Sequence, residues 1–188
     1  MLVRYADDFV IVFEQEDDAR RVFTVLPKRF GKYGLALHPT KTRMVRFHRP
    51  PPGPLSGQAK PETFDLLGFT HFWTRSWRGH WVVMLKTAKS RFSRARRGIA
   101  EWCRRNRHRP VLEQHRTLTE KLTGHFAYFG IVGNLGALLR LRHAVYGAWR
   151  QWLNRRSQRA RITWQRMRAL HLRYPLPSAP PHLRHLRA

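Results

Sequence analysis

The apolar residues change their spacing near Thr87, and this change limits the possible folds more than any other feature. Beyond it, apolar residues recur every three or four positions, as on a helix with one buried face: Ala88, Phe92, Ala95, Ile99 and Trp102. Before it, short β-branched and aromatic runs alternate with turn residues, as in strands. The sequence therefore predicts an α+β fold, with a partial sheet in residues 1–86, a helical domain in 87–173 and a Pro-rich tail in 174–188.

The strand-rich part predicts one hairpin, one helix and further strands. Residues 2–14 predict the hairpin, and the acidic residues Glu16–Asp18 suit the start of a helix. We expect Pro27 to kink this helix or end it early, because proline lacks the amide hydrogen. Residues 35–48 predict strand, turn and strand, and residues 63–86 predict two more strands. A Pro- and Gly-rich loop should separate the last two regions.

The helical part predicts three main helices and a shorter one. The second should begin near Pro110, and the third after Asn134, a residue type that favours the N-cap. The shorter helix should start at Thr163, and the Pro-rich tail, with little to bury, should be loosely ordered. The tryptophans on the apolar stripes are expected in the core: Trp102, Trp149 and Trp152.

The charge of the chain points to a polyanionic partner. There are 37 Lys and Arg against 11 Asp and Glu, a net charge of +26, and no acidic residue follows Glu120. A long stretch of one sign favours a phosphate-binding surface, although arginine-rich usage in a genome is an alternative explanation. The arginines off the apolar stripes are the expected phosphate contacts: Arg94, Arg97, Arg104, Arg105, Arg155, Arg156 and Arg159.

Composition also bears on the cellular compartment. A single cysteine, Cys103, excludes an intramolecular disulfide and suits a reducing compartment. No apolar run approaches the roughly 18–20 residues that span a bilayer, and the first residues do not read as a signal peptide. We therefore expect a cytoplasmic protein with no membrane partner.

Two adjacent carboxylates, Asp7 and Asp8, lie between apolar runs near the start of the chain. In most proteins such a pair would be a turn residue and a surface charge. Here it occupies a tight turn between strands that we expect to be buried, in a chain with few acids. Carboxylate oxygens on a fixed turn suit Mg²⁺, and two such ions can support phosphoryl transfer.

The tetrapeptide Y-A-D-D around this pair resembles the active-site hairpin of reverse transcriptases. Further segments resemble later parts of such enzymes in the same order: GLALHPTKT the next palm motif, FDLLGF the primer-grip hairpin, LTGHFAYFGIVGN and WRQWLNRRSQ the thumb or maturase region, and TWQRMRALHLRYPLP the C-terminal end. On these motifs the chain is identified as a member of the group II intron reverse transcriptase/maturase family.

The resemblance implies roles for individual residues. Asp7 and Asp8 match the metal-binding pair, with Mg²⁺ as the cofactor, whereas Tyr5 and Ala6 match positions that line the primer end and the incoming nucleotide. Lys41 would lie near the triphosphate as a charge stabiliser or proton donor. An ordinary surface lysine is an equally good interpretation of Lys41.

Two more assignments follow from the same resemblance. Leu67, Gly68 and Phe69 would hold the primer backbone, since glycine permits close approach; a core strand with a bulge is the alternative. His38, beside the turn that carries Lys41, is interpreted as a solvated loop histidine rather than a ligand.

The resemblance also implies RNA-directed DNA polymerase activity, with intron RNA and an RNA/DNA primer-template as partners. A complete member has fingers and the first half of the palm, with another catalytic aspartate, before this hairpin, whereas this sequence begins at Met1. We expect the chain alone to be inactive and to act with a separate N-terminal half. The alternative is a non-catalytic RNA-binding module or a truncated remnant.

Overall fold

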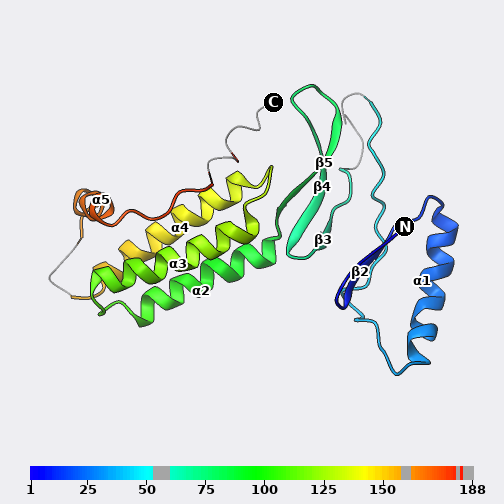
Figure 1. Ribbon diagram of the computed structural model, residues 1–188, viewed down its shortest axis with the longest axis horizontal. Coiled ribbons are helices and arrows are strands. Elements are labelled where there is room, and N and C mark those ends of the chain that lie inside the picture. Colours follow the sequence, from blue (N-terminus) through cyan, green and yellow to red (C-terminus); the bar gives the residue numbers. More distant parts are fainter. Residues whose placement is uncertain (53–59, 158–161, 181–182, 184–188) are drawn as a thin grey trace. The chain divides into compact units, whose positions relative to one another are not determined.

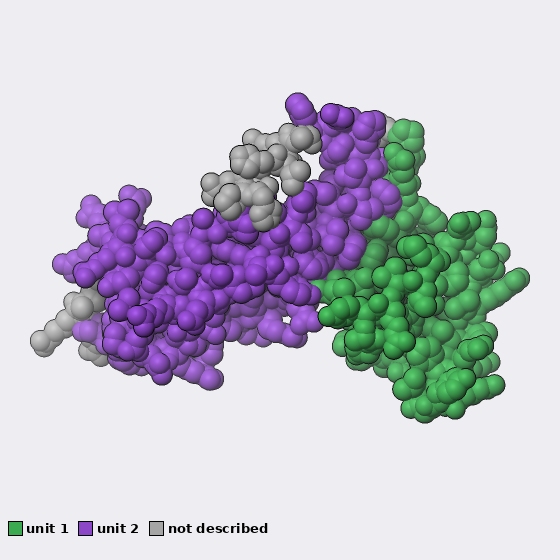
Figure 2. All heavy atoms as spheres, in the orientation of Figure 1, with its two compact units in different colours: residues 1–67 green, residues 68–188 purple. Residues whose placement is uncertain are grey.

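The computed structural model describes residues 1–52, 60–157, 162–180 and 183. The chain forms two compact units, residues 1–67 and residues 68–188, which Figure 2 colours separately. Most of the expected Pro- and Gly-rich loop lies outside the described residues. None of the helices in the described part is both long and apolar enough to cross a membrane.

The first unit opens with the predicted hairpin, made of strands β1 (Leu2–Tyr5) and β2 (Asp8–Ile11) (Figure 1). The strands are antiparallel, and Val3 lies opposite Val10. The ring of Phe9 stacks on that of Phe30 at a centroid distance of 5.9 Å. This contact joins the hairpin to the helix that follows.

Helix α1 (Glu16–Gly31) begins where the acidic residues predict it. Its acidic first turn and basic last turn both complement the helix dipole. The expected early end at Pro27 does not occur, because the helix runs on to Gly31. No residue of α1 is buried, so water can bond the carbonyl that the proline leaves without an amide partner.

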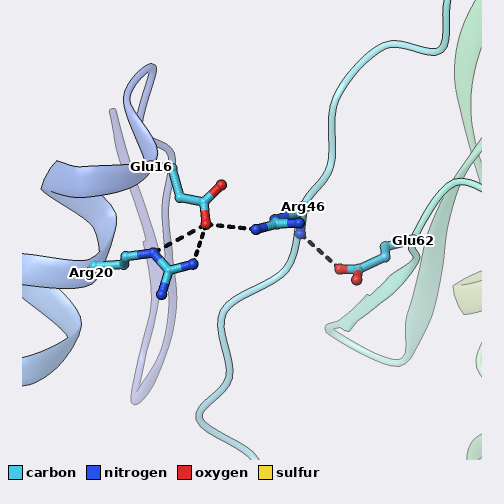
Figure 3. Close-up of polar contacts among 4 residues, drawn as sticks. All are labelled: Glu16, Arg20, Arg46 and Glu62. Atoms are coloured by element: carbon cyan, nitrogen blue, oxygen red, sulfur yellow. Dashed lines mark hydrogen bonds and ion pairs between the residues drawn. The ribbon is translucent and has the colours of Figure 1, made fainter.

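Residues 35–48 do not form the predicted strands; a turn at residues 39–41 is their only regular feature. Side chains hold this segment instead of a strand ladder. Arg46 donates to the Glu16 carboxylate at 2.8 Å, while the Arg46 amide donates to Glu62 at 2.7 Å (Figure 3). Arg20 donates to the same Glu16 oxygen. The strand prediction was wrong because β-structure needs a neighbouring strand, which local sequence cannot report.

The second unit begins with a hairpin of β4 (Phe69–Arg75) and β5 (Trp81–Thr87), in which Phe72 lies opposite Met84. These are the two strands predicted over residues 63–86. A short additional strand, β3 (Phe64–Leu66), ends the first unit.

The predicted helices form at the expected places: α2 (Lys89–Arg105), α3 (Val111–Phe129), α4 (Leu135–Asn154) and α5 (Trp164–Arg173). Together with the strands they confirm the α+β class. Their apolar stripes meet in one core, whose fully buried members include Leu118 and Leu122 on α3 and Leu141 on α4. Trp149 is fully buried there, whereas Trp102 and Trp152 pack against the core and stay partly exposed.

The start of α4 is held differently from the prediction. Asn134 occupies the N-cap position, but its side chain makes no capping hydrogen bond. It accepts from the Thr87 amide and donates to the Thr87 hydroxyl and the Phe129 carbonyl, each at 2.8 Å. All these groups are in the second unit, so Asn134 links the end of β5 to α3 and α4. Helix α5 starts where the sequence predicts it, and Thr163 caps it by accepting from the Arg166 amide.

The tail after α5 is packed rather than loose over its described part. Leu176, Ala179 and Leu183 are buried in the helical core. Arg142 donates to the carbonyls of Pro177 and Leu176 at 3.0 and 3.3 Å. The expectation of a loose tail was wrong because its spaced apolar side chains pack into the core that the assembled helices form.

The division into compact units falls after Leu67, whereas the sequence places the domain boundary after residue 86. Packing explains the difference, because Phe69 stacks on Tyr128 and the Gly68 carbonyl accepts from the Ala88 amide at 2.9 Å. These contacts attach the β4–β5 hairpin to the helices. The functional domain division at residue 86 stays a prediction.

Candidate active site and nucleic-acid interface

The tip of the β1–β2 hairpin carries the paired carboxylates. Tyr5 pairs with Asp8, so Ala6 and Asp7 are the two loop residues. Ala6 has a φ of 52°, which suits the turns that match strand twist but costs a residue with a Cβ about 1–2 kcal/mol. The side chain of Arg4 donates to the Ala6 carbonyl at 2.9 Å and holds this conformation. The tip is therefore a defined, strained turn, as functional turns often are.

Both carboxylates are accessible to a cation. Asp7 and Asp8 are exposed, and within the described part of the chain neither side chain has an ion-pair or hydrogen-bond partner. The described residues also contain no group of three His, Cys, Asp or Glu that could hold a metal ion. Two free carboxylates match what Mg²⁺ takes from a protein when substrate phosphates and waters complete its shell. The residues at the tip therefore fit this ion, as part of its ligand set.

The strands that carry the pair are not the buried platform that the sequence predicted. Leu2, Val3 and Tyr5 are 62%, 45% and 67% exposed. Only Phe9, Val10 and Ile11 on β2 are partly covered. The prediction was wrong because a single hairpin with one helix beside it lacks enough neighbours to bury both of its faces.

Lys41 lies on the turn after Pro39 and is exposed. His38 stabilises this turn: its Nδ1 atom lies 3.3 Å from the Thr40 amide, and its carbonyl accepts from the Thr42 amide at 3.0 Å. This local use agrees with the interpretation of His38 as a loop histidine. Within the described residues no contact joins Lys41 to the carboxylate pair, so its role at the triphosphate stays a prediction.

The candidate primer-binding residues lie at the turn between β3 and β4. Leu67 and Gly68 have φ values of 50° and 81°, so this turn places two successive residues in the left-handed region. A Cβ on Gly68 would meet its neighbours only at ordinary contact distances of 3.5–3.6 Å, so the backbone angle is what favours glycine. Phe69 contacts Phe129 with ring centroids 5.1 Å apart. These residues have a visible structural role, and their primer contact stays a prediction.

Several candidate RNA-binding arginines meet where α2 and α4 end. They line a hollow of about 410 Å³, which we name the arginine–tryptophan hollow, and its lining residues are Arg104, Arg105, Arg107, Trp152 and Arg155. Sequence reasoning assigned Trp152 to the core and did not single out Arg107, which follows the end of α2. The position of Arg107 three residues after Arg104 was the available signal, because it continues the helical row of arginines into the loop.

The other candidate arginines are placed elsewhere. Arg94 and Arg97 line a second hollow, of about 520 Å³, together with Ser90, Ser93, Gly98 and Glu101. Arg156 is partly buried and donates to the carbonyls of His108 and Arg109 at 3.0 and 2.7 Å. Its guanidinium thus holds the α2–α3 loop in place. Arg159 lies outside the described residues.

Two ionisable side chains of α2, Glu101 and Cys103, have pKa values shifted by their surroundings. Hydrogen bonds from Arg104 and Arg105, each 2.8 Å long, lower the pKa of Glu101. Burial raises the pKa of the Cys103 thiol to about 12, so this cysteine is no candidate nucleophile. The chemistry available here is the binding of anions by guanidinium groups.

Two known families match successive parts of the chain. The reverse transcriptase (RNA-dependent DNA polymerase) family matches residues 1–71, which include the carboxylate pair. The group II intron maturase-specific domain matches residues 92–170, which include the arginine–tryptophan hollow. A comparison with curated proteins finds no match. Reverse transcriptases generally use divalent metal ions, and the maturase domain implies binding of intron RNA. With both matches in this order on one chain, the protein belongs to the group II intron-encoded reverse transcriptase/maturase family.

Proposed function

We propose that this chain supplies the Asp7–Asp8 carboxylates to a reverse transcriptase site and binds intron RNA through its helices. The observation that carries the proposal is the succession of a reverse transcriptase match and a maturase match on one polypeptide. The unpartnered carboxylates and the cationic hollow support it with chemistry suited to each role.

In the polymerase role, a primer hydroxyl attacks the α-phosphate of an incoming nucleotide and pyrophosphate leaves. Bound Mg²⁺ would stabilise the charge that develops on the attacking and leaving oxygens. Asp7 and Asp8 would hold the ion, Tyr5 and Ala6 would line the primer end, and Lys41 would face the departing pyrophosphate. Leu67, Gly68 and Phe69 would hold the primer backbone.

We further propose that a third carboxylate comes from a separate polypeptide with the fingers and the first half of the palm. The described residues contain no group of three or more His, Cys, Asp or Glu that could hold a metal ion, so the pair at the hairpin tip has no third ligand among them. Without a third ligand the two-metal arrangement is incomplete. The chain alone should therefore not extend a primer.

The test is primer extension on an RNA template with Mg²⁺ and nucleotides. The purified chain should give no product, and co-expression with a fingers–palm half from a relative should give product that Asp7→Asn abolishes. Asp17→Asn is the matched control, because it removes an equally exposed carboxylate from α1. Extension by the chain alone that disappears in Asp7→Ala would contradict the proposal.

For RNA binding, phosphate contacts predict a measurable salt dependence. The logarithm of the association constant should fall linearly with the logarithm of salt concentration, by roughly 0.7–0.9 per phosphate neutralised. Joint substitution of Arg105 and Arg155 by Gln should make this slope shallower, whereas Asp7→Asn with Asp8→Asn should leave affinity unchanged or slightly raised. A flat salt dependence would show that the charge is only compositional.

A non-catalytic RNA-binding module is the second candidate function. It is favoured by the apolar core of the second unit, which is formed by residues of that unit alone. The two candidates separate if RNA binding persists while no fingers–palm half restores extension. Either role suits the cytoplasm, the compartment that the single cysteine predicts.

A further inference from the structure

The arginine–tryptophan hollow contains a flat, fixed platform. The guanidinium carbon of Arg155 lies 4.9 Å from the ring centroid of Trp152, within the range of cation–π attraction. Trp152 is itself held by packing against the helical core. Arg155 is exposed, so its planar group rests on the indole while remaining open to a ligand. A guanidinium plane held in this way can stack on a nucleobase.

The part of the lining around Arg107 is ordered by hydrogen bonds. Arg107 donates to the Arg104 carbonyl at 3.0 Å, and its own carbonyl accepts from Gln114 at 3.2 Å. Gln114 is buried and accepts in turn from the Trp149 indole at 2.9 Å. Because this part of the lining is already ordered, a ligand would lose little affinity to the cost of ordering it.

The charge of the hollow selects an anion. Four arginines line it and no carboxylate does. Glu101 pairs with Arg104 and Arg105 from beside the hollow, which orients these two guanidinium groups but compensates only one charge. Each guanidinium has five N–H donors, so the paired arginines keep donors free for phosphate oxygens.

We propose that this hollow binds one unpaired nucleotide of the RNA, with its phosphate on Arg104, Arg105 and Arg107 and its base stacked on Arg155. The inference rests on the RNA binding proposed above and adds what kind of RNA segment is recognised. A base inside a duplex has both faces covered, and A-form helices are contacted mainly through phosphates and sugars. A flat cationic platform beside phosphate donors can take up a base only when that base is unstacked. The volume of about 410 Å³ also suits a group the size of a nucleotide.

The test compares two RNA hairpins that differ in a single unpaired nucleotide. One probe is fully paired and the other carries a one-nucleotide bulge, and both are titrated with the full chain by fluorescence anisotropy at the same series of salt concentrations. The wild type should bind the bulged probe about ten- to a hundredfold more tightly, the size expected for stacking one base. Arg155→Lys, which keeps the charge but loses the plane, should remove most of this preference and keep the salt slope.

Further variants separate stacking from charge and from misfolding. Arg107→Gln should weaken the bulged probe more than the paired one. Arg94→Gln with Arg97→Gln, in the other hollow, should weaken both probes equally. Trp152→Leu should act like Arg155→Lys, but Arg155→Lys decides the matter because Arg155 is exposed and outside the core.

The outcomes distinguish this inference from the broader proposal. Equal binding of both probes by the wild type, or a bulge preference unchanged in Arg155→Lys, would overturn the nucleotide site and leave RNA binding intact. Failure of the wild type to bind either probe would overturn both.

Discussion

The two units of this chain differ in how far their apolar side chains are buried. In the second unit, α4 alone buries Leu138, Leu141, Val145 and Trp149 in a shared core. In the first unit, no residue of α1 is buried, and Leu2, Val3 and Tyr5 on β1 are exposed. The second unit therefore has an apolar core of its own, whereas the hairpin with the carboxylate pair has apolar surface left uncovered within its own unit.

Polar contacts differ between the units in the same way. Buried amide side chains, Asn134 and Gln114, join elements of the second unit. Exposed ion pairs, centred on Glu16 and Arg46, join elements of the first (Figure 3). Loss of a buried hydrogen bond leaves unpaired groups that are costly, whereas an exposed ion pair contributes little.

We expect the greatest loss of stability from a substitution in the core of the second unit. Leu141 is fully buried, so Leu141→Ala should lower the free energy of unfolding of this unit by about 2–5 kcal/mol. Urea unfolding followed by circular dichroism at a helical wavelength measures this loss. The matched change Leu2→Ala, on the 62% exposed leucine of β1, should alter stability by no more than about 0.5 kcal/mol. Similar losses from both substitutions would break the comparison.

A smaller effect is expected where the hairpin of the second unit joins its helices. Asn134→Ala removes the partner of the Thr87 amide and the Phe129 carbonyl, so it should cost about 1–3 kcal/mol. Hydrogen exchange of the Thr87 amide should accelerate beyond the global change. Thr87→Ser keeps the hydroxyl and serves as the control. An unchanged exchange rate in Asn134→Ala would show that packing alone holds β5 to the helices.

The packed tail gives a third and smaller effect. Arg142→Met removes the donor to the Pro177 and Leu176 carbonyls, which should cost about 0.5–1.5 kcal/mol and speed proteolysis near residues 174–180. Arg140→Met is the control, since Arg140 is an exposed arginine on the same helix. If both variants are cleaved at the wild-type rate, apolar burial alone retains the tail.

The smallest effect concerns the ion pairs of the first unit. Hydrogen bonds from Arg46 and Arg20 lower the pKa of Glu16 from 4.5 to about 2. The folded state therefore gains from the ionised carboxylate above pH 4.5, and this gain is lost as the pH falls toward 2. The carboxyl carbon resonance of Glu16 should titrate with a midpoint near 2. Glu16→Gln should remove this part of the pH dependence of unit 1, and a midpoint near 4.5 in the wild type would refute the ion-pair assignment.

The helices of the second unit, the first hairpin and the class of the fold could all be predicted from the sequence. These depend on local patterns: apolar spacing in α2, α3 and α4, acidic residues at the start of α1, and a turn between two β-branched runs. The sequence also identified the candidate carboxylates, because the Y-A-D-D motif places both aspartates at one turn whatever lies around it. Arg94, Arg104 and Arg155 could be named as surface arginines for the same reason.

Contacts between residues distant in sequence could not be predicted in the same way. Residues 35–48 form no strands, and Leu176 is buried. In the folded chain the Arg156 side chain donates to backbone carbonyls, and Arg107 and Trp152 line the same hollow. The physical reason is common to all four cases. Strand pairing, burial and the sharing of a guanidinium depend on partners distant in sequence, and these become neighbours only when the helices and hairpins have packed.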